Sequence, residues 1–590
     1  MRPLTRASRS DGLIVLGLIV LAVGLPAIIG IASGAIWIPH NDDFAYRRTA
    51  LLFFETGRME LTGWGVMTLV GQIVATMPLL WLANGAAWAF AATGALFAIV
   101  GVVAGYELAR RLLSPRMAGF AVLVAVVFPG FMLYTTTYMT DVPAFAMEMA
   151  CLTTGAAALQ RQAAADRWRW LAVSLAIGCY AFSIREFAIA APLAVLAAAV
   201  SSERQGRRLA YVVAFVGTIG VCAAIYLYSS GLPGQGVPAL GPPTEASYRK
   251  LLGAIAALCL TIAPALVIGV ATWGPHWWRS RRRSALIGAL GGTVVAGIVF
   301  LEEVRALVSG DLGGVTSVLV GNVFQAQGSL GPAVFAGTRP LLYVAPWWAM
   351  LNLLAFAATV VAFAFIGAAL AAQGDRLVRA LDLRRRPTAL GSVPGLLLAF
   401  GVILSAGTIA VGLTSNLFDR YAWPLPLPFV ILLLLRPSPE PATATSAAEG
   451  SSGLARSGLT IVAGTMVAVI ATASLVLLLN ADAFDAARWR IGEEAVRRGL
   501  AAETVDAGLE WVGMHATGLA DPFAPRVPGM TPWAVRFSSF HQCAVASSTP
   551  LTLPGATLEL EWPAAYRALL FIGPPRPMYL YRMAGPGCPA

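Results

Sequence analysis

Four short polar motifs interrupt a chain that is otherwise strongly apolar, and their residue types suit group transfer. Carboxylates such as Asp42, Asp43 and Asp141 can act as a general base for a hydroxyl or hold a divalent metal. Arginines such as Arg185 and Arg420 suit phosphate, because the guanidinium fork donates to two oxygens at once. Together they supply both halves of a transferase with a phosphate-linked donor. The motifs lie at residues 40–43, 138–143, 185–186 and 419–421.

Each motif also has an ordinary structural explanation, which for residues 40–43 is a simple polar loop. Asp141 precedes a Val-Pro pair and would serve equally well at a helix N-terminus. Arg185 and Glu186 are adjacent and would fit a structural ion pair. Arg420 would fit a residue that sets membrane orientation. The sequence alone therefore leaves both explanations open for each motif.

The composition places these motifs in a polytopic membrane protein. Of the 590 residues, 58% are hydrophobic and only 12% are charged, too few charges to keep a soluble chain of this size in solution. A helix needs roughly 20 apolar residues to cross the hydrocarbon, and the apolar runs predict about 13 transmembrane helices. The net charge of +11 comes from short arginine clusters between these runs. Such clusters are typical of orientation signals, so no nucleic-acid partner is expected.

The same arginine clusters predict the orientation. Arg2, Arg6 and Arg9 precede the first apolar run, Leu13–Gly34, so the N-terminus is expected in the cytoplasm. Later clusters fall on the same side of the alternating runs. All four motifs are then expected at the outer face of a bacterial-type plasma (inner) membrane.

The chain divides into four predicted parts. They are a transmembrane catalytic domain at 1–435 with outer loops at 35–85 and 302–343, a disordered cytoplasmic linker at 436–458, a last transmembrane helix at 459–479, and a small extracytoplasmic α/β domain at 480–590. Within the last part, helical spacing at 482–499 is followed by strand character at 551–562 and 568–572.

Two details of this organisation depend on placement relative to the membrane. Val66–Leu82, inside the first outer loop, is apolar enough to cross, and the sequence leaves open whether it does. Cys543 and Cys588 lie in the polar C-terminal part and can form a disulfide if that part is outside the cytoplasm.

The motifs and their order resemble the GT-C glycosyltransferases, in particular the branch with protein O-mannosyltransferases and aminoarabinose transferases. A tail stretch, Asp506–Gly513, also resembles a segment of bacterial members. The resemblance covers about residues 12–435 and rests on His40-Asn41-Asp42-Asp43, Tyr138-Met139-Thr140-Asp141-Val142-Pro143, an arginine at the position of Arg185, and Asp419-Arg420-Tyr421 before a proline-rich helix.

The resemblance implies an inverting transfer of a sugar from a polyprenyl-phosphate donor to an extracytoplasmic glycan, lipid or protein. Asp42 or Asp43 would be the general base and Asp141 a second acidic element. The family commonly has an Asp-Glu or Glu-Asp pair in the first loop, so the Asp-Asp pair leaves the base undecided. The bilayer would hold the donor.

The resemblance also implies the donor-phosphate side of the site. Arg185, Arg420 and Tyr421 would face the phosphate. His40 has no counterpart in the family pattern, and it is kept with Glu186 as a candidate for an auxiliary role. Some members need a divalent metal such as Mg or Mn and others do not, and the motifs here do not decide between them or identify ligands. No GxGxxG or P-loop motif indicates a nucleotide donor.

The alternative is a secondary transporter or flippase for a polyprenyl-linked or anionic substrate. Transporters place charges near the bilayer midplane and often show repeated halves. Here the polar motifs fall at the outer ends of spans, and no repeat is evident. A non-catalytic scaffold would leave the first-loop acid pair and Arg185 unexplained. The sequence therefore favours a membrane glycosyltransferase.

Overall fold

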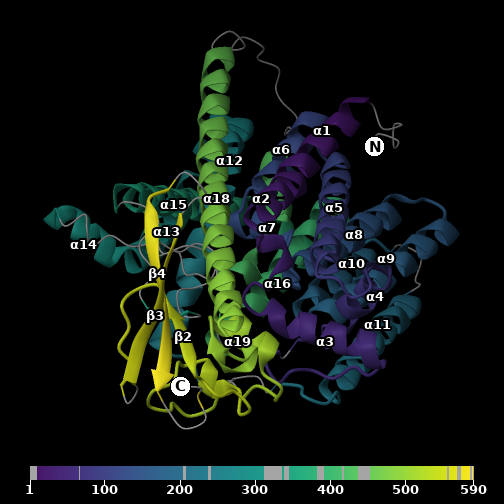
Figure 1. Ribbon diagram of the computed structural model, residues 1–590. Helices are drawn as coiled ribbons and strands as arrows, with labels where there is room; N and C mark the ends of the chain where they lie inside the picture. The colour runs from purple at the N-terminus through teal and green to yellow at the C-terminus, as the bar shows by residue number, and fades with distance from the viewer. Residues whose placement is uncertain are drawn as a thin grey trace.

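Apolar helices dominate the computed structural model of the chain, and the longest described helix, α18 (Ser452–Arg497), runs from the top of the molecule down to the C-terminal sheet (Figure 1). The structure describes residues 9–65, 67–203, 208–236, 241–310, 335–337, 345–381, 391–414, 417–435, 452–521, 523–554, 557–567, 573–584 and 588. The remaining helices are α1 (Arg9–Ile19), α2 (Leu25–Ser33), α3 (Asp43–Thr56), α4 (Val70–Ala83), α5 (Trp88–Arg110), α6 (Pro115–Val126), α7 (Pro129–Tyr134), α8 (Asp141–Gln160), α9 (Ala164–Ile184), α10 (Ala190–Ser201), α11 (Arg208–Ser230), α12 (Glu245–Ser280), α13 (Arg282–Val299), α14 (Leu301–Ser309), α15 (Ala345–Leu381), α16 (Val393–Thr414), α17 (Pro426–Leu434) and α19 (Leu509–His515).

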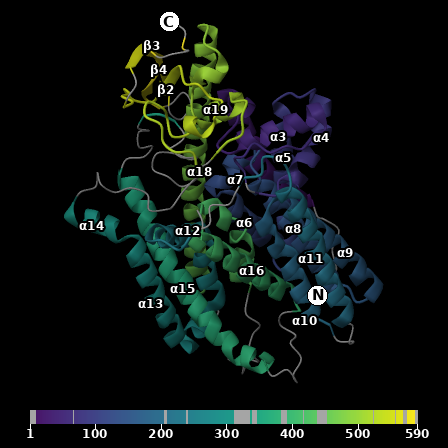
Figure 2. The same cartoon turned by 90° about the horizontal axis from the view of Figure 1, so that it is seen from below.

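Nine helices in the described part of the chain are long and apolar enough to cross a membrane. Three shorter apolar helices accompany them, at Val70–Ala83, Pro115–Val126 and Glu186–Ser201. The predicted helical, multi-pass membrane fold is therefore confirmed, while the number of 13 spans stays a prediction. Viewed from below, α13, α14 and α15 form a group set apart from α3, α4 and α5 (Figure 2).

The first predicted outer loop, 35–85, contains two helices, α3 and α4. The α4 helix has 14 residues, which at about 1.5 Å per residue is roughly 21 Å long. The hydrocarbon layer is roughly 30 Å thick, so α4 alone is too short to cross it. The second predicted loop, 302–343, begins inside α14, and most of its remainder lies outside the described residues.

The C-terminal part is a small sheet packed on the end of α18. The sheet has four strands in the order β1-β2-β4-β3, in which β1 and β2 are parallel and the other pairs antiparallel. A core that includes Phe484, Trp511 and Leu580 joins α18, α19 and the sheet. The predicted strand at 568–572 lies outside the described residues. The strands are β1 (Val505–Asp506), β2 (Ala544–Ser547), β3 (Thr557–Arg567) and β4 (Pro575–Ala584).

The α18 helix crosses the predicted domain boundary at 479/480 without a break. It begins at Ser452, inside the range predicted as a disordered linker, and residues 436–451 lie outside the described part. Extending an existing helix by one residue avoids the cost of nucleation, which explains why the helix continues past both ends of its apolar core. The C-terminal part is thus joined to the membrane helices by one continuous helix.

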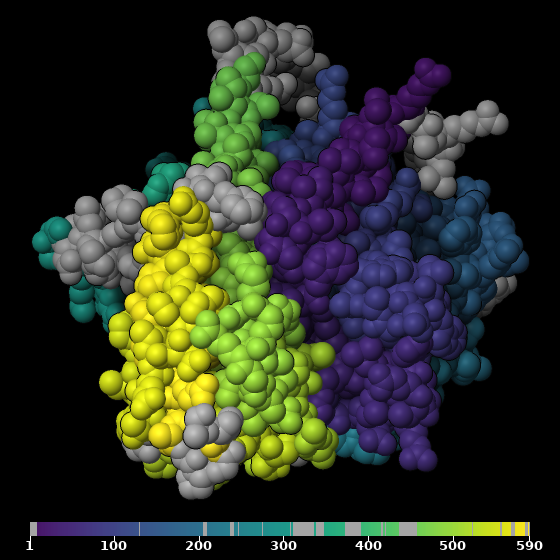
Figure 3. Space-filling view, in the orientation of Figure 1, coloured from purple at the N-terminus to yellow at the C-terminus, as the bar shows by residue number. Residues whose placement is uncertain are grey.

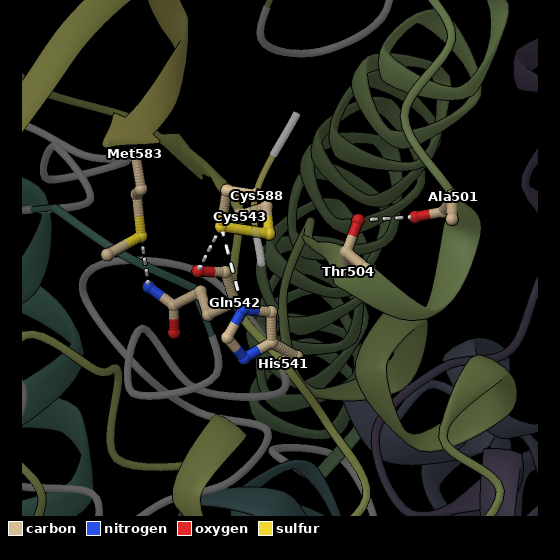
Figure 4. Close-up of a disulfide and its surroundings, with 7 residues drawn as sticks. All are labelled: Ala501, Thr504, His541, Gln542, Cys543, Met583 and Cys588. Atoms are coloured by element: carbon tan, nitrogen blue, oxygen red, sulfur yellow. Dashed lines mark hydrogen bonds between the residues drawn. A yellow bond between two sulfur atoms is a disulfide. The ribbon is translucent and has the colours of Figure 1, made fainter. Parts of the chain in front are cut away.

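A disulfide fixes the end of the chain to the sheet. Cys543 and Cys588 are bonded, with 5.3 Å between their Cα atoms, and His541 lies beside them (Figure 4). The backbone of Cys543 bonds on both sides, donating to Thr504 and accepting from Met583, at 2.8 Å each. The pairing considered in the sequence is therefore present in the structure.

Candidate active site

The acid loop, residues 39–43, lies between α2 and α3. Gly34 ends α2 with a left-handed φ of +83°, and Asn41 turns the chain with a φ of +52°. This leaves Asp42 at the N-cap of α3 and Asp43 as its first residue. Because neighbouring residues of a helix point in directions about 100° apart, the two adjacent carboxylates face different surroundings.

Asp43 is fully buried, and both of its carboxylate oxygens accept hydrogen bonds. Its Oδ1 accepts from the His40 backbone at 2.6 Å, and its Oδ2 accepts from Arg47 Nη2 at 3.2 Å and from the Tyr138 backbone at 3.0 Å. Burial raises the pKa of Asp43 above its ordinary value, although Arg47 and His40 act in the opposite direction. Asp43 therefore ties the acid loop to the second motif.

Asp42 is the more accessible acid, because its side chain is 21% exposed. Its Oδ1 accepts from Trp64 Nε1 at 2.9 Å, and its Oδ2 lies 2.9 Å from Arg420 Nη2. Asp42 is thus held at a definite orientation while part of its carboxylate stays open. Of the two acids, only Asp42 is partly accessible to solvent.

Four charged side chains from the four motifs form one connected group, which we call the site cluster: Asp42, Asp141, Arg185 and Arg420. Arg420 links the two acids, with its Nε 3.9 Å from Asp141 Oδ1. Arg185 Nη1 lies 2.9 Å from Asp141 Oδ2 and donates to Thr140 at 2.7 Å. The two arginines and Asp141 are nearly inaccessible to solvent. The spatial convergence expected of the four motifs is therefore present.

Helix ends position these side chains. Asp141 is the first residue of α8, and Arg185 has an extended backbone between α9 and the 3₁₀ turn Glu186–Ile189. Arg420 lies in the 3₁₀ turn Asp419–Ala422 that precedes α17. A Cβ at Gly94 of α5 would lie 2.6 Å from the Thr137 carbonyl oxygen, so glycine allows α5 to approach the stretch leading to Asp141.

Aromatic rings support both guanidinium groups. The Tyr421 ring lies 4.8 Å from the guanidinium carbon of Arg185 and 5.7 Å from that of Arg420. Phe187 and Phe418 add a second ring to each arginine, at 5.0 and 4.9 Å. Cation–π contacts of this kind hold the planar groups in place without using their N–H donors.

Not every predicted site residue joins the cluster. His40 faces away, with Nδ1 2.8 Å from Asp485 Oδ2 and Nε2 2.9 Å from the Ala35 carbonyl. One oxygen of Glu186 is buried without a hydrogen-bond partner in the described part of the chain. The side chain of Asp419 lies outside what the structure describes.

Three residues near the cluster were not predicted. Trp64 donates a hydrogen bond to the Asp42 carboxylate. Tyr46 lies one helical turn after Asp42, on α3. Tyr46 is buried beside a small cavity, and burial raises the pKa of its hydroxyl, with the charge of Asp42 acting in the same direction. Glu148, seven residues after Asp141 on α8, is fully buried. The i+4 and i+7 spacings would have indicated Tyr46 and Glu148 had the helix starts been known.

The acids of the site cluster do not form a metal-binding group by themselves. Among the described residues, only His541, Cys543 and Cys588 bring three potential ligand atoms close together, and the two sulfurs are bonded to each other. This group lies in the C-terminal sheet region.

These features define a multi-pass membrane protein with an acid–arginine site at one end of its helices. Residues 73–228 match the family model of dolichyl-phosphate-mannose-protein mannosyltransferases. The predicted resemblance to GT-C membrane glycosyltransferases is thereby confirmed, and the matched stretch includes Asp141 and Arg185.

Two solved structures are also similar, at low identity. The crystal structure of ArnT from Cupriavidus metallidurans bound to undecaprenyl phosphate is 13% identical, covering 97% of this chain and 99% of that one, with a TM-score of 0.39. The apo state of the same protein is 14% identical, covering 71% and 76%, with a TM-score of 0.31. No curated protein matches the chain.

Proposed function

We propose that this chain is an inverting glycosyltransferase that moves a sugar from a polyprenyl-phosphate carrier to an acceptor hydroxyl outside the cytoplasm. The observation that carries the proposal is the site cluster, in which side chains from four distant motifs form one line of charge contacts. Two carboxylates and two arginines match the two requirements of the reaction, which are to take a proton from the acceptor and to stabilise the departing phosphate.

The family match supports the donor class. Its description names a dolichyl-phosphate-linked mannose, and dolichyl phosphate is a polyprenyl phosphate. Arg185 and Arg420 are the groups we assign to the donor phosphate, with Tyr421 fixing both guanidinium planes. The 3.9 Å contact between Arg420 and Asp141 is longer than a hydrogen bond, so a phosphate oxygen can replace it without breaking one.

We assign the general base to Asp42. The acceptor oxygen attacks the anomeric carbon from the face opposite the phosphate, and its proton passes to Asp42. The bond between the anomeric carbon and the phosphate oxygen breaks, and the carrier phosphate leaves with the electron pair beside the arginines. Asp43 is the weaker candidate because its side chain is fully buried, whereas that of Asp42 is 21% exposed.

We also propose that the site faces the outside of a bacterial-type plasma membrane, with the N-terminus in the cytoplasm and the C-terminal part outside. The arginine clusters support this orientation. The Cys543–Cys588 disulfide supports it independently, because disulfides persist mainly in oxidising compartments.

The test is transfer of radiolabel from a panel of polyprenyl-phosphate sugars in membranes that contain wild type, Asp42→Asn or Asp43→Asn at matched levels of folded protein. We expect wild type to transfer label to an acceptor and Asp42→Asn to lose at least about 100-fold, since general-base catalysis typically contributes 10²–10⁴-fold. Asp43→Asn is the matched control, because the neighbouring acid carries the same charge but is assigned a structural role.

Three outcomes would contradict the proposal. Full transfer by Asp42→Asn would remove Asp42 as the base, and a selective loss in Asp43→Asn would give the role to Asp43. No transfer from any donor, together with labelled lipid crossing the bilayer, would identify a flippase instead.

A further inference from the structure

The acid loop is held from the C-terminal part of the chain as well as from the membrane helices. The Asn41 backbone N–H donates to Glu510 Oε1 at 2.7 Å, and His40 contacts Asp485. Both partners lie more than 400 residues away along the chain. Asn41 has a positive φ, which Asn adopts more readily than most residues with a side chain, and the contact to Glu510 holds the loop in this conformation.

The partners of the loop form a buried group, which we call the tail network: His40, Asp485, Arg488 and Glu510. Arg488 connects the two acids, donating through Nε to Asp485 Oδ1 at 3.2 Å and through Nη1 to Glu510 Oε2. The four side chains are between 1% and 7% exposed. Because each charge has an opposite charge in contact, the group forms a stiff connection between α18, α19 and the acid loop.

A second connection reaches Asp42 from its other side. Trp64, which donates to the Asp42 carboxylate, stacks on Phe537 with 6.4 Å between ring centres and 12° between planes. The guanidinium of Arg536 lies 5.3 Å from the Trp64 ring. Residues of the C-terminal part therefore contact Asn41, the residue before Asp42, and Trp64, which donates a hydrogen bond to Asp42.

Close packing joins α19 to the start of α3. A Cβ at Gly513 would collide with the Phe44 ring, and Arg48 donates to the Gly513 carbonyl at 2.7 Å. Figure 3 shows the C-terminal residues, in yellow-green, lying directly against the purple N-terminal segment. The tail stretch Asp506–Gly513 therefore has a definite place, because its Glu510 and Gly513 contact the acid loop and α3.

We propose that the C-terminal part contributes to catalysis. Its residues Glu510, Asp485 and Arg488 are positioning residues that hold Asp42 in its reactive orientation. The inference rests on the proposed function, because it assumes that Asp42 acts on the acceptor. It assigns the C-terminal part a role in the rate of the chemical step, in addition to any role in binding an acceptor.

The test measures kcat and the donor KM for Glu510→Ala, Glu510→Gln and Trp64→Phe. The kcat is normalised to the amount of folded protein. We expect Glu510→Ala and Trp64→Phe to lower kcat about 10- to 100-fold with the donor KM within about twofold, because small misplacements of catalytic groups cost this much and the donor arginines are untouched. Glu510→Gln keeps an oxygen for the Asn41 N–H and should recover most of the kcat.

Glu494→Gln is the control, since Glu494 lies on α18 together with Asp485 and Arg488 but pairs with Arg497 and Arg498 away from the acid loop. Its kcat should equal that of wild type. A purely structural role would reduce the yield of folded Glu510→Ala and leave kcat unchanged. Trp64→Phe keeps an aromatic ring at that position and decides the matter if Glu510→Ala does not fold.

The result that overturns the inference is a wild-type kcat in Trp64→Phe and in every folded Glu510 variant. Asp42→Asn, assayed in parallel, separates the two proposals. If Asp42→Asn is inactive while the positioning variants are fully active, the inference fails and the proposed function stands. If Asp42→Asn is fully active, the assignment of the base fails.

Discussion

The site cluster and the tail network lie on two sides of one loop and consist of similar charged groups, but they use hydrogen bonds differently. In the tail network every carboxylate oxygen of Asp485 and Glu510 contacts a donor group. In the site cluster neither oxygen of Asp141 accepts a hydrogen bond from the described residues, although Arg185 lies 2.9 Å away. Hydrogen bonds to Asp42 and from Arg185, ring contacts and charge attraction hold the site cluster, and Asp141 keeps acceptor capacity for a ligand hydroxyl.

This difference separates charged groups that stabilise the fold from charged groups that can bind a substrate. Disturbing a buried ion group typically costs about 3–5 kcal/mol, because removing one partner leaves the other charge buried and unpaired. Arginines that are also held by cation–π contacts can exchange a carboxylate partner for a phosphate oxygen when the donor binds. One arginine in each group, Arg420 and Arg488, offers a direct way to test the distinction.

The largest effect is expected for Arg420→Lys, measured as the initial rate of sugar transfer. Lysine keeps the charge but cannot lie flat on Tyr421 while reaching both Asp42 and Asp141. We expect a loss of about 100-fold, similar to the removal of one transition-state hydrogen-bond donor, with little change in the melting temperature. Arg488→Lys is the matched substitution in the tail network. Transfer at the wild-type rate by Arg420→Lys would show that Arg420 does not bind the donor phosphate.

The next effect is a loss of stability in Arg488→Met. Removing this guanidinium leaves Asp485 and Glu510 buried without their common partner, which typically costs about 3–5 kcal/mol. Unfolding of the purified protein in detergent measures the change. Arg490→Met, at an exposed position on the same helix, is the control and should stay within about 0.5 kcal/mol of wild type. Equal stability of the two variants would mean that the tail network is not a structural unit.

The convergence of the site cluster could be predicted, because it follows from topology. Arginine clusters and apolar runs put residues 42, 141, 185 and 420 at the same ends of their helices, and short motifs at helix ends meet wherever the helices pack side by side. The adjacent charges of Arg185 and Glu186, which hydrocarbon would not tolerate, likewise indicate the break between α9 and the 3₁₀ turn that follows it.

The sequence could not decide between Asp42 and Asp43. The decision depends on the backbone turn at Asn41 and on which of the two side chains points into the protein at the start of α3. The hydrogen-bond partners of His40 and Asn41 could not be predicted either. Asp485 and Glu510 lie 445 and 469 positions further along the chain, and no local periodicity links them to the acid loop. The boundary drawn at 479/480 followed the end of the apolar run, whereas α18 continues through it because its polar end is buried against the acid loop.

The smallest expected effect is a change of stability with pH. It comes from His40 in the tail network and again distinguishes the tail network from the site cluster. Burial lowers the pKa of His40, but the hydrogen bond and charge of Asp485, with the charges of Asp43 and Asp482, outweigh burial and raise the pKa to about 9. The unfolded value is 6.5. The resulting stabilisation, at most about 3 kcal/mol, is fully present below pH 6.5 and is lost as the pH rises through about 9.

Thermal unfolding between pH 6 and 10 measures this contribution. Wild type should lose stability over that range by an amount that His40→Gln does not show, because glutamine has no proton to lose there. Both ring nitrogens of His40 face acceptors, Asp485 and the Ala35 carbonyl, so only the doubly protonated ring satisfies both contacts. The same pH slope in His40→Gln would place the titrating group elsewhere and would mean that the tail network holds a neutral His40.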